Sequence, residues 1–189
     1  MEDVVWLMEN AKLRQRRYLV LLIQQRVYAA EEVRDAIRAN VHDFGRQMRD
    51  RGAVVMPYEE QVATTFAEVT AKPWPEALRD RMDATKYPFL VIIDRDFADF
   101  DPTEHRAAVV WFEDYAEAPD TIWQVFDTIT GAVTGEDDLF DALAEVERAA
   151  WAEARAEMVD RYVDARIPVI PGIVSLKANA LIRGLLRRM

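Results

Sequence analysis

The hydrophobic positions of this chain fall into short unbroken runs separated by longer stretches of mixed character. Three of the runs are residues 18–23 (YLVLLI), 53–56 (AVVM) and 89–93 (FLVII). Continuous apolar runs of this length, rich in branched side chains, are typical of strands that are buried on both faces of a sheet. We therefore expect at least three buried strands.

The stretches between these runs place apolar residues at helical spacing. We expect helices over residues 2–16, 30–50, 59–71, 120–131, 136–165 and 173–188, with a short one carrying Leu78 and Met82 after the break at residues 72–75 (KPWP). A short edge strand is expected over residues 167–170. Strands that alternate with helices indicate βαβ units and a parallel sheet.

These elements predict one α/β domain over residues 1–189. We expect a doubly wound, mostly parallel sheet of four to five strands with helices on both faces, a flavodoxin-like or TIR-like layout. The N-terminal helix (residues 2–16) and a C-terminal helical extension (residues 136–189) would be added to it.

Residues 102–117 fit two patterns. The first is a single turn at 102–106 followed by a strand at 107–113 (AAVVWFE). The second is one helix over 102–117, because Ala108, Trp111, Phe112 and Tyr115 also match helical spacing. We favour the turn and strand.

Composition removes several classes of function. The net charge of −10 argues against general nucleic-acid binding, which needs a positive surface. The chain has no cysteine, which excludes disulfides and thiol catalysis. No apolar run is long enough to span a bilayer, so we expect a cytoplasmic protein without a transmembrane segment.

Known motifs are also lacking. The sequence has no phosphate-binding glycine loop and no dinucleotide fingerprint. Its one serine, Ser175, is not in a nucleophile motif. The two histidines, His42 and His105, lack the spacing of the usual zinc sites.

The strongest chemical signal is an acidic cluster that follows the run at 89–93. It consists of Asp94, Asp96, Asp99, Asp101 and Glu104. Asp94 and Asp96 are candidate ligands for Mg²⁺, which prefers oxygen and often takes only one or two carboxylates from the protein. We expect them in a crevice at the carboxyl ends of the strands at 18–23 and 88–94. Alternatively the aspartates form turns and helix caps, with Asp101 as an N-cap and Glu104 at position N3 of a capping box.

Two family resemblances centre on the same residues. The string IIDRD is similar to the end-of-strand acidic pairs of metal-dependent phosphotransferases and Toprim-type nuclease domains. The order of elements, with Glu104 ten residues after Asp94, loosely resembles a TIR-like domain. That resemblance implies that Glu104 acts as the acidic catalyst in cleavage of a nicotinamide dinucleotide.

The helices at the two ends of the chain favour a different function. Amphipathic helices over 2–16, 136–165 or 173–189 would contact a protein partner or a second copy of the chain, as a homo-oligomer. We therefore expect a regulatory or interaction module that self-associates. The alternative is an enzyme that acts on a nucleotide or phosphoester through Asp94 and Asp96 with Mg²⁺, or through Glu104.

Overall fold

The fold is taken from a computed structural model, which describes residues 4–5, 16–24, 31–48, 51–57, 59–135, 138–145 and 173–176. Its strands are β1 (Val4–Val5), β2 (Tyr18–Ile23), β3 (Gly52–Val55), β4 (Phe89–Ile93), β5 (Ala107–Trp111) and β6 (Ile173–Leu176). Its α-helices are α1 (Glu31–Met48), α2 (Val62–Thr70), α3 (Glu76–Ala84) and α4 (Trp123–Thr134), with a further helix over 139–145. Its 3₁₀ turns are η2 (Glu59–Gln61), η3 (Phe97–Asp99), η4 (Phe112–Tyr115) and η5 (Pro119–Thr121).

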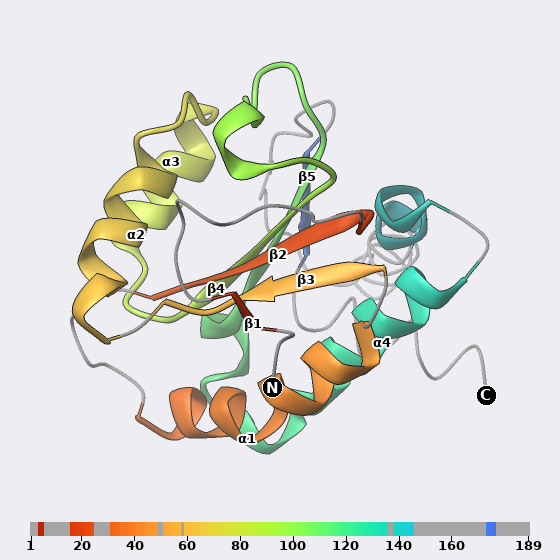
Figure 1. Ribbon diagram of the computed structural model, residues 1–189. Helices are drawn as coiled ribbons and strands as arrows, with labels where there is room; N and C mark the ends of the chain where they lie inside the picture. The colour runs from red at the N-terminus through yellow and green to blue at the C-terminus, as the bar shows by residue number, and fades with distance from the viewer. Residues whose placement is uncertain are drawn as a thin grey trace, which may run out of the picture.

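The strands form one mixed sheet in the order β1-β3-β2-β4-β5-β6 (Figure 1). Its four central strands contain one parallel pair, β2 with β3, and two antiparallel pairs, β2 with β4 and β4 with β5. The edge strands β1 and β6 pair in parallel with β3 and β5. The expectation of a mostly parallel, doubly wound sheet with a flavodoxin-like or TIR-like layout was therefore wrong.

The reversal of β4 follows from the connection that precedes it. A single helix between two strands returns the chain to the end of the sheet where the first strand began, so the second strand runs parallel to the first. Between β3 and β4 the chain instead forms two helices, α2 and α3, separated by the break at residues 72–75. The second helix brings the chain back to the end of the sheet where β3 ended. β4 therefore starts from that end and runs antiparallel to both β3 and β2. The connection from β4 to β5 contains only the 3₁₀ turn η3, and β5 again reverses direction.

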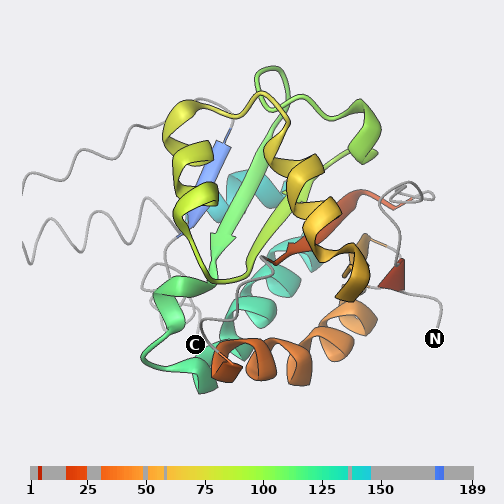
Figure 2. The same cartoon turned by 90° about the vertical axis from the view of Figure 1, so that its left-hand side faces the viewer.

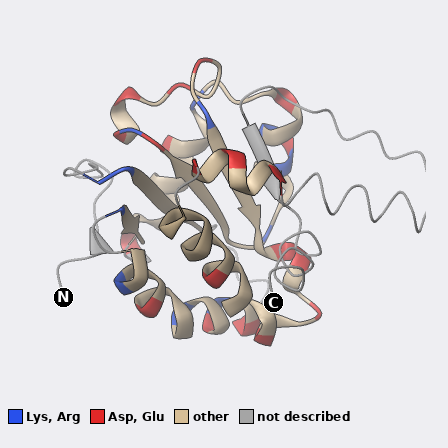
Figure 3. Ribbon diagram, turned by 90° about the vertical axis from the view of Figure 1, so that its right-hand side faces the viewer, with Lys and Arg blue, Asp and Glu red and all other residues tan. Residues whose placement is uncertain are grey.

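Helices cover both faces of the sheet, as expected. On one face α1 and α4 lie side by side, with the rings of Phe44 and Phe126 4.8 Å apart (Figure 1). On the other face lie α2 and α3, which Figure 2 shows from the side. The central strands between these layers carry no charged residue (Figure 3).

Each central strand divides its side chains between the two layers. In β2, Tyr18, Val20 and Leu22 pack toward α1 and α4, whereas Leu19, Leu21 and Ile23 pack toward α2 and α3. All six are at most 1% exposed. Burial of such a side chain contributes about 1.5–3 kcal/mol, so replacing one with a polar residue that finds no hydrogen-bond partner would be strongly destabilising. This confirms the expectation that the apolar runs are strands buried on both faces.

The structure also resolves the ambiguity at residues 102–117. A turn at 102–104 leads into β5, and η4 follows at once. All five residues of β5 are buried between β4 and β6. The favoured turn and strand are therefore confirmed, and the single helix over 102–117 is wrong.

The ends of the chain differ from expectation in two places. Residues 4–5 form a strand inside the helix expected over 2–16, and residues 173–176 form a strand at the start of the helix expected over 173–188. Both short segments are strands because they form hydrogen bonds with a neighbouring strand, and the spacing of apolar residues along the sequence does not reveal such pairing. The helix at 139–145 agrees with the start of the one expected over 136–165, while the expected edge strand at 167–170 lies outside the described residues. Among the described helices, none combines the length and apolarity needed to cross a membrane.

Candidate functional site

The two predicted metal ligands, Asp94 and Asp96, follow β4 and are both half-buried. The Oδ1 atom of Asp94 accepts a hydrogen bond from Nε of Arg95 at 3.2 Å. Asp96 precedes η3, and its carbonyl oxygen accepts a hydrogen bond from the backbone N–H of Asp99. One carboxylate is thus already neutralised by a neighbouring guanidinium.

The direction of β4 moves these aspartates away from the expected crevice. Because β4 is antiparallel to β2, Ile93 lies opposite Leu19, near the start of β2. The carboxyl ends of β2 and β4 are consequently at opposite ends of the sheet. The end that holds Asp94 is shared with Ala107 at the start of β5.

Asp101 organises the turn between β4 and β5. Its Oδ1 accepts hydrogen bonds from the backbone N–H of Thr103 at 2.8 Å and from the Thr103 hydroxyl at 2.6 Å. These hydrogen bonds from Thr103 lower the pKa of the Asp101 carboxyl. Its own backbone N–H donates to Nδ1 of His105 at 2.9 Å. Asp101 therefore does cap a turn, as the alternative to a metal site proposed.

Glu104 is exposed on this turn, and its place in the capping box was assigned incorrectly. The reciprocal acceptor for the Asp101 N–H is His105, one residue further along the chain. Toward the described residues, Glu104 uses its backbone N–H, in a hydrogen bond to the Asp101 carbonyl at 3.1 Å. The catalytic role that the TIR-like resemblance implied for Glu104 stays a prediction.

The described residues contain no group of three or more histidine, aspartate or glutamate side chains placed to hold a metal ion. Binding of Mg²⁺ at Asp94 and Asp96 stays a prediction from the sequence. An unchanged melting temperature with Mg²⁺ or Mn²⁺ at constant ionic strength would show that the two aspartates serve only the turn, with Asp94 paired to Arg95. A filled site at 100 times its dissociation constant would instead add about 2.7 kcal/mol, several degrees for a chain of this size.

Thermal unfolding of three proteins separates these outcomes: the native chain, Asp94→Asn with Asp96→Asn, and Asp99→Asn as a control in the same loop. A metal-dependent rise that disappears only in the double variant would establish the site. Phosphoester and nucleotide substrates would then be tested next.

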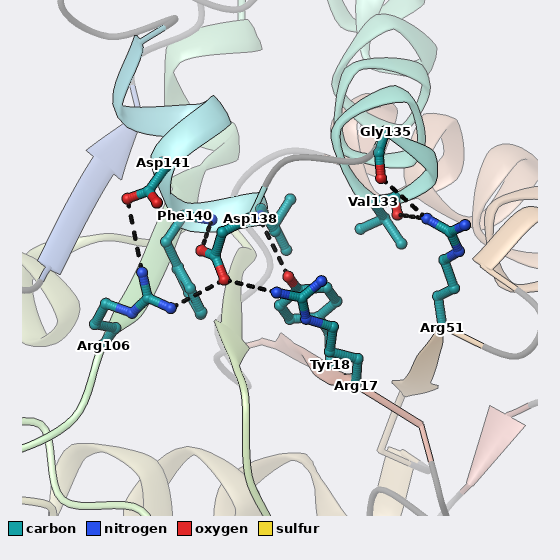
Figure 4. A network of polar contacts seen from close by, with 10 residues as sticks. Arg17, Tyr18, Arg51, Arg106, Val133, Gly135, Asp138, Phe140 and Asp141 are labelled. Carbon is teal, nitrogen blue, oxygen red and sulfur yellow. Dashed lines mark hydrogen bonds and ion pairs between the residues drawn. The ribbon is translucent and has the colours of Figure 1, made fainter.

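A larger charged network lies at the same end of the sheet, around Asp138 (Figure 4). The Oδ2 atom of Asp138 accepts hydrogen bonds from Arg17 at 2.9 Å and from Arg106 at 3.0 Å. Its Oδ1 atom accepts from the backbone N–H of Phe140 at 3.0 Å, which caps the helix over 139–145. One carboxylate thus joins the start of β2, the start of β5 and the start of that helix.

Asp138 is suited to this role by its electrostatics. Its side chain is 21% exposed, and burial alone would raise its pKa. The hydrogen bond and positive charge of Arg106, the N–H of Phe140 and the charge of Arg17 outweigh burial and lower the pKa below its usual value. Asp138 therefore stays ionised and binds both arginines throughout the neutral range.

Two neighbouring contacts extend the network. The Tyr18 hydroxyl accepts a hydrogen bond from the backbone N–H of Leu139 at 3.1 Å. Arg51 donates to the carbonyl oxygens of Val133 at 2.8 Å and Gly135 at 3.1 Å, at the C-terminal end of α4 (Figure 4). A guanidinium at this position compensates the negative end of the helix dipole. Through these contacts the starts of β2, β5 and the helix over 139–145, and the C-terminal end of α4, are joined to one another.

At the opposite end of the sheet, Arg81 of α3 contacts the residues that follow β5. Its guanidinium lies 4.2 Å from the ring centre of Trp111. Its Nε donates to Glu113 at 2.7 Å, and it forms a second ion pair with Asp114 at 3.3 Å. Glu113 and Asp114 are therefore neutralised within the fold.

The acidic residues that come next in the chain have a different environment. Glu117, Asp120 and Asp127 are exposed and form no ion pair with another described residue. Trp123, the first residue of α4, is 50% exposed. Asp120 lies three residues before it and Asp127 four residues after it, about one helical turn on either side, and Glu117 lies six residues before it. Within the part of the chain that the structure describes, Trp123 is the only large hydrophobic side chain that is exposed. We call Glu117, Asp120, Trp123 and Asp127 the Trp123 surface.

The sequence alone identified neither the network around Asp138 nor the Trp123 surface. Trp123 lies beside the apolar stripe of the helix expected over 120–131, where core packing is the usual outcome, and Arg17 lies 121 positions before Asp138, so no local pattern relates the two. The signal that could have identified the surface is a tryptophan within a stretch that contains acidic residues and no lysine or arginine. Comparison with known proteins adds no further guide, since no protein-family model, curated protein or solved structure matches this chain.

Proposed function

We propose that this protein is an interaction module whose Trp123 surface binds a positively charged, amphipathic segment of another protein. The observation that carries the proposal is the exposure of Trp123 among acidic side chains that have no described counter-charge. Both faces of the sheet are already covered by helices, so this surface is the place where the described residues offer apolar area to a partner.

An exposed tryptophan has a large effect on recognition. Tryptophan is among the residues that contribute most to protein interfaces, because a rigid ring buries much apolar area at a small entropic cost. Its face also attracts arginine and lysine, by roughly 0.5–2 kcal/mol depending on solvation. A partner that presents leucines and arginines together would satisfy both the ring and the carboxylates.

The charge distribution along the chain supports a basic partner. No lysine or arginine occurs between Arg106 and Arg148, whereas acidic residues recur throughout this stretch. Carboxylates of one sign around an apolar centre attract a positively charged segment and repel nucleic acid. The partner class that fits is therefore a basic amphipathic helix.

We further propose that the module acts in the cytoplasm and self-associates, as expected from its sequence. Association through residues 2–16, 136–165 or 173–189 falls almost entirely outside the described residues and stays a prediction. Sedimentation over a range of concentrations measures it directly.

The binding experiment uses a fluorescent synthetic helix of alternating leucine and arginine pairs, titrated with the full chain at low salt. We expect Trp123→Ala, and separately Asp120→Lys with Asp127→Lys, to weaken binding at least about tenfold. We also expect affinity to fall as salt is raised, because the carboxylates are exposed.

The control is Glu68→Lys with Asp80→Lys, which makes the same change in net charge on the exposed sides of α2 and α3. Weakening by this control to the same extent would show that only net charge matters. Unchanged affinity in Trp123→Ala would also contradict the proposal.

A further inference from the structure

We propose that the Trp123 surface is occupied, in the absence of a partner, by residues 177–189 of the same chain. This inference rests on the proposed function, since it names a competitor for the same surface. It follows from the position of β6, from the charge of the segment that comes after it, and from the chemistry of the surface described above.

The register of β6 determines where the segment leaves the sheet. β6 lies beside β5 (Figure 2) and pairs with it in parallel. Leu176 lies opposite Val110. The C-terminal ends of β5 and β6 therefore lie at the same end of the sheet. Residue 177 follows at the edge where β5 continues into η4 and then into the Trp123 surface.

The composition of the segment complements that surface. Residues 177–189 read KANALIRGLLRRM, with Lys177, Arg183, Arg187 and Arg188 and no acidic residue. Leu181, Ile182 and Leu185 lie at helical spacing and would form one apolar side. This is the combination of leucines and arginines that an exposed tryptophan with exposed carboxylates one helical turn away would bind.

The reach of the segment is sufficient. As a helix, residues 177–189 would extend about 20 Å, and as an extended chain about twice that. A segment tethered beside its site has an effective concentration in the millimolar range, far above the concentration of a second copy. The same chain is therefore the favoured occupant.

Occupancy by this segment would regulate the module. A partner helix must displace residues 177–189, so its apparent affinity is reduced by the fraction of molecules with a free surface. We expect the variant with Leu181, Ile182 and Leu185 all changed to serine, which leaves the net charge of the chain unchanged, to bind the leucine–arginine peptide at least about tenfold more tightly than the native chain. These positions follow β6, and an unchanged melting temperature confirms that the fold is intact.

This titration separates the two proposals. Equal affinity of the two chains, with binding still lost in Trp123→Ala, would overturn the inference and leave the proposed function standing. Absence of peptide binding to either chain would overturn both.

Cross-linking tests the contact itself, and the absence of cysteine makes the labelling specific. Ala118→Cys, exposed between Glu117 and Asp120, is combined with Ala180→Cys and treated with a short bis-maleimide. The control pair places the first cysteine at Ala67 instead, exposed on α2 on the other face of the sheet. We expect the 118–180 pair to cross-link within one chain at least about tenfold faster than the 67–180 pair, and to lose this advantage in 1 M salt.

Three results would overturn the inference. Equal rates for the two pairs would show that residues 177–189 have no preferred site. Cross-linked dimers would identify a second copy as the occupant. Loss of the 118–180 product on addition of anionic phospholipid vesicles, with the labelled segment bound to them even at low lipid, would identify a membrane surface.

Discussion

Replacing Trp111 with alanine is expected to lower the free energy of unfolding by about 3–5 kcal/mol, the usual cost of removing a large ring from a core. Trp111 ends β5 and is fully buried, with its ring centre 5.2 Å from that of Phe89. The change would also remove the surface on which the Arg81 guanidinium rests at 4.2 Å. Part of the space left would stay empty, because strands on either side hold β5 in place.

Urea unfolding measures this loss as a lower midpoint with an unchanged slope. Trp123→Ala is the matched control, since it removes the same side chain from a position that is 50% exposed. We expect that variant to change stability by less than about 1 kcal/mol. Similar losses for the two variants would contradict the assignment of Trp111 to the core and Trp123 to the surface.

Replacing Asp138 with asparagine is expected to destabilise the protein by about 2 kcal/mol at neutral pH. Hydrogen bonds to a charged group contribute roughly 1.5–3 kcal/mol when buried, and less here because Arg17 and Arg106 are 57% and 42% exposed. Asparagine can still cap the helix at 139–145 through its oxygen, so the loss reports mainly on the two arginines. Asp141→Asn is the control: Asp141 is 75% exposed and contacts Arg106 at 3.7 Å, and we expect less than about 0.5 kcal/mol.

The same pair of proteins predicts a dependence on pH. The folded pKa of Asp138 lies below its unfolded value of about 3.9, so the carboxylate stabilises the fold above that pH. The contribution is lost as pH falls through the lower, folded pKa, where the native side chain also becomes neutral. We therefore expect the stability difference between the native chain and Asp138→Asn to be constant from pH 7 to pH 5 and to shrink below about pH 4. A difference that stayed constant down to pH 2 would show that charge is not what Asp138 contributes.

The identity of most elements could be predicted because it depends on local pattern. The runs at 18–23 and 89–93 are strands because six and five consecutive apolar residues can only be buried when both faces of the sheet are covered. The helices α1 to α4 follow from apolar residues repeating every three or four positions. The preference for a strand at 107–113 succeeded because branched residues and a tryptophan favour a pleated, buried segment.

The candidate sites were harder to predict, since their members come together only through the fold. Asp138 contacts Arg17, which lies 121 positions earlier in the chain, and no local pattern relates them. The aspartates after β4 formed a visible cluster, but the partner of Asp94 proved to be its neighbour Arg95. Trp123 borders the apolar stripe of its helix, and spacing alone does not decide whether a residue at the border of such a stripe is buried or exposed.

By itself, then, the sequence of this protein determined the four central strands, the helices α1 to α4 and the two-sided burial of the sheet, because each depends on side chains within a few residues of one another. Tertiary structure decided the direction of β4, since that depends on how many times the chain crosses between β3 and β4, and α2 and α3 make two crossings. Because of that direction, Asp94 lies near the start of β2 and not near its end. The crevice that a parallel sheet would have formed between the carboxyl ends of β2 and β4 is therefore absent. It was likewise the packing of α4 against α1 that buried Phe126 and left Trp123 exposed, because a helix can turn only one side toward its neighbour.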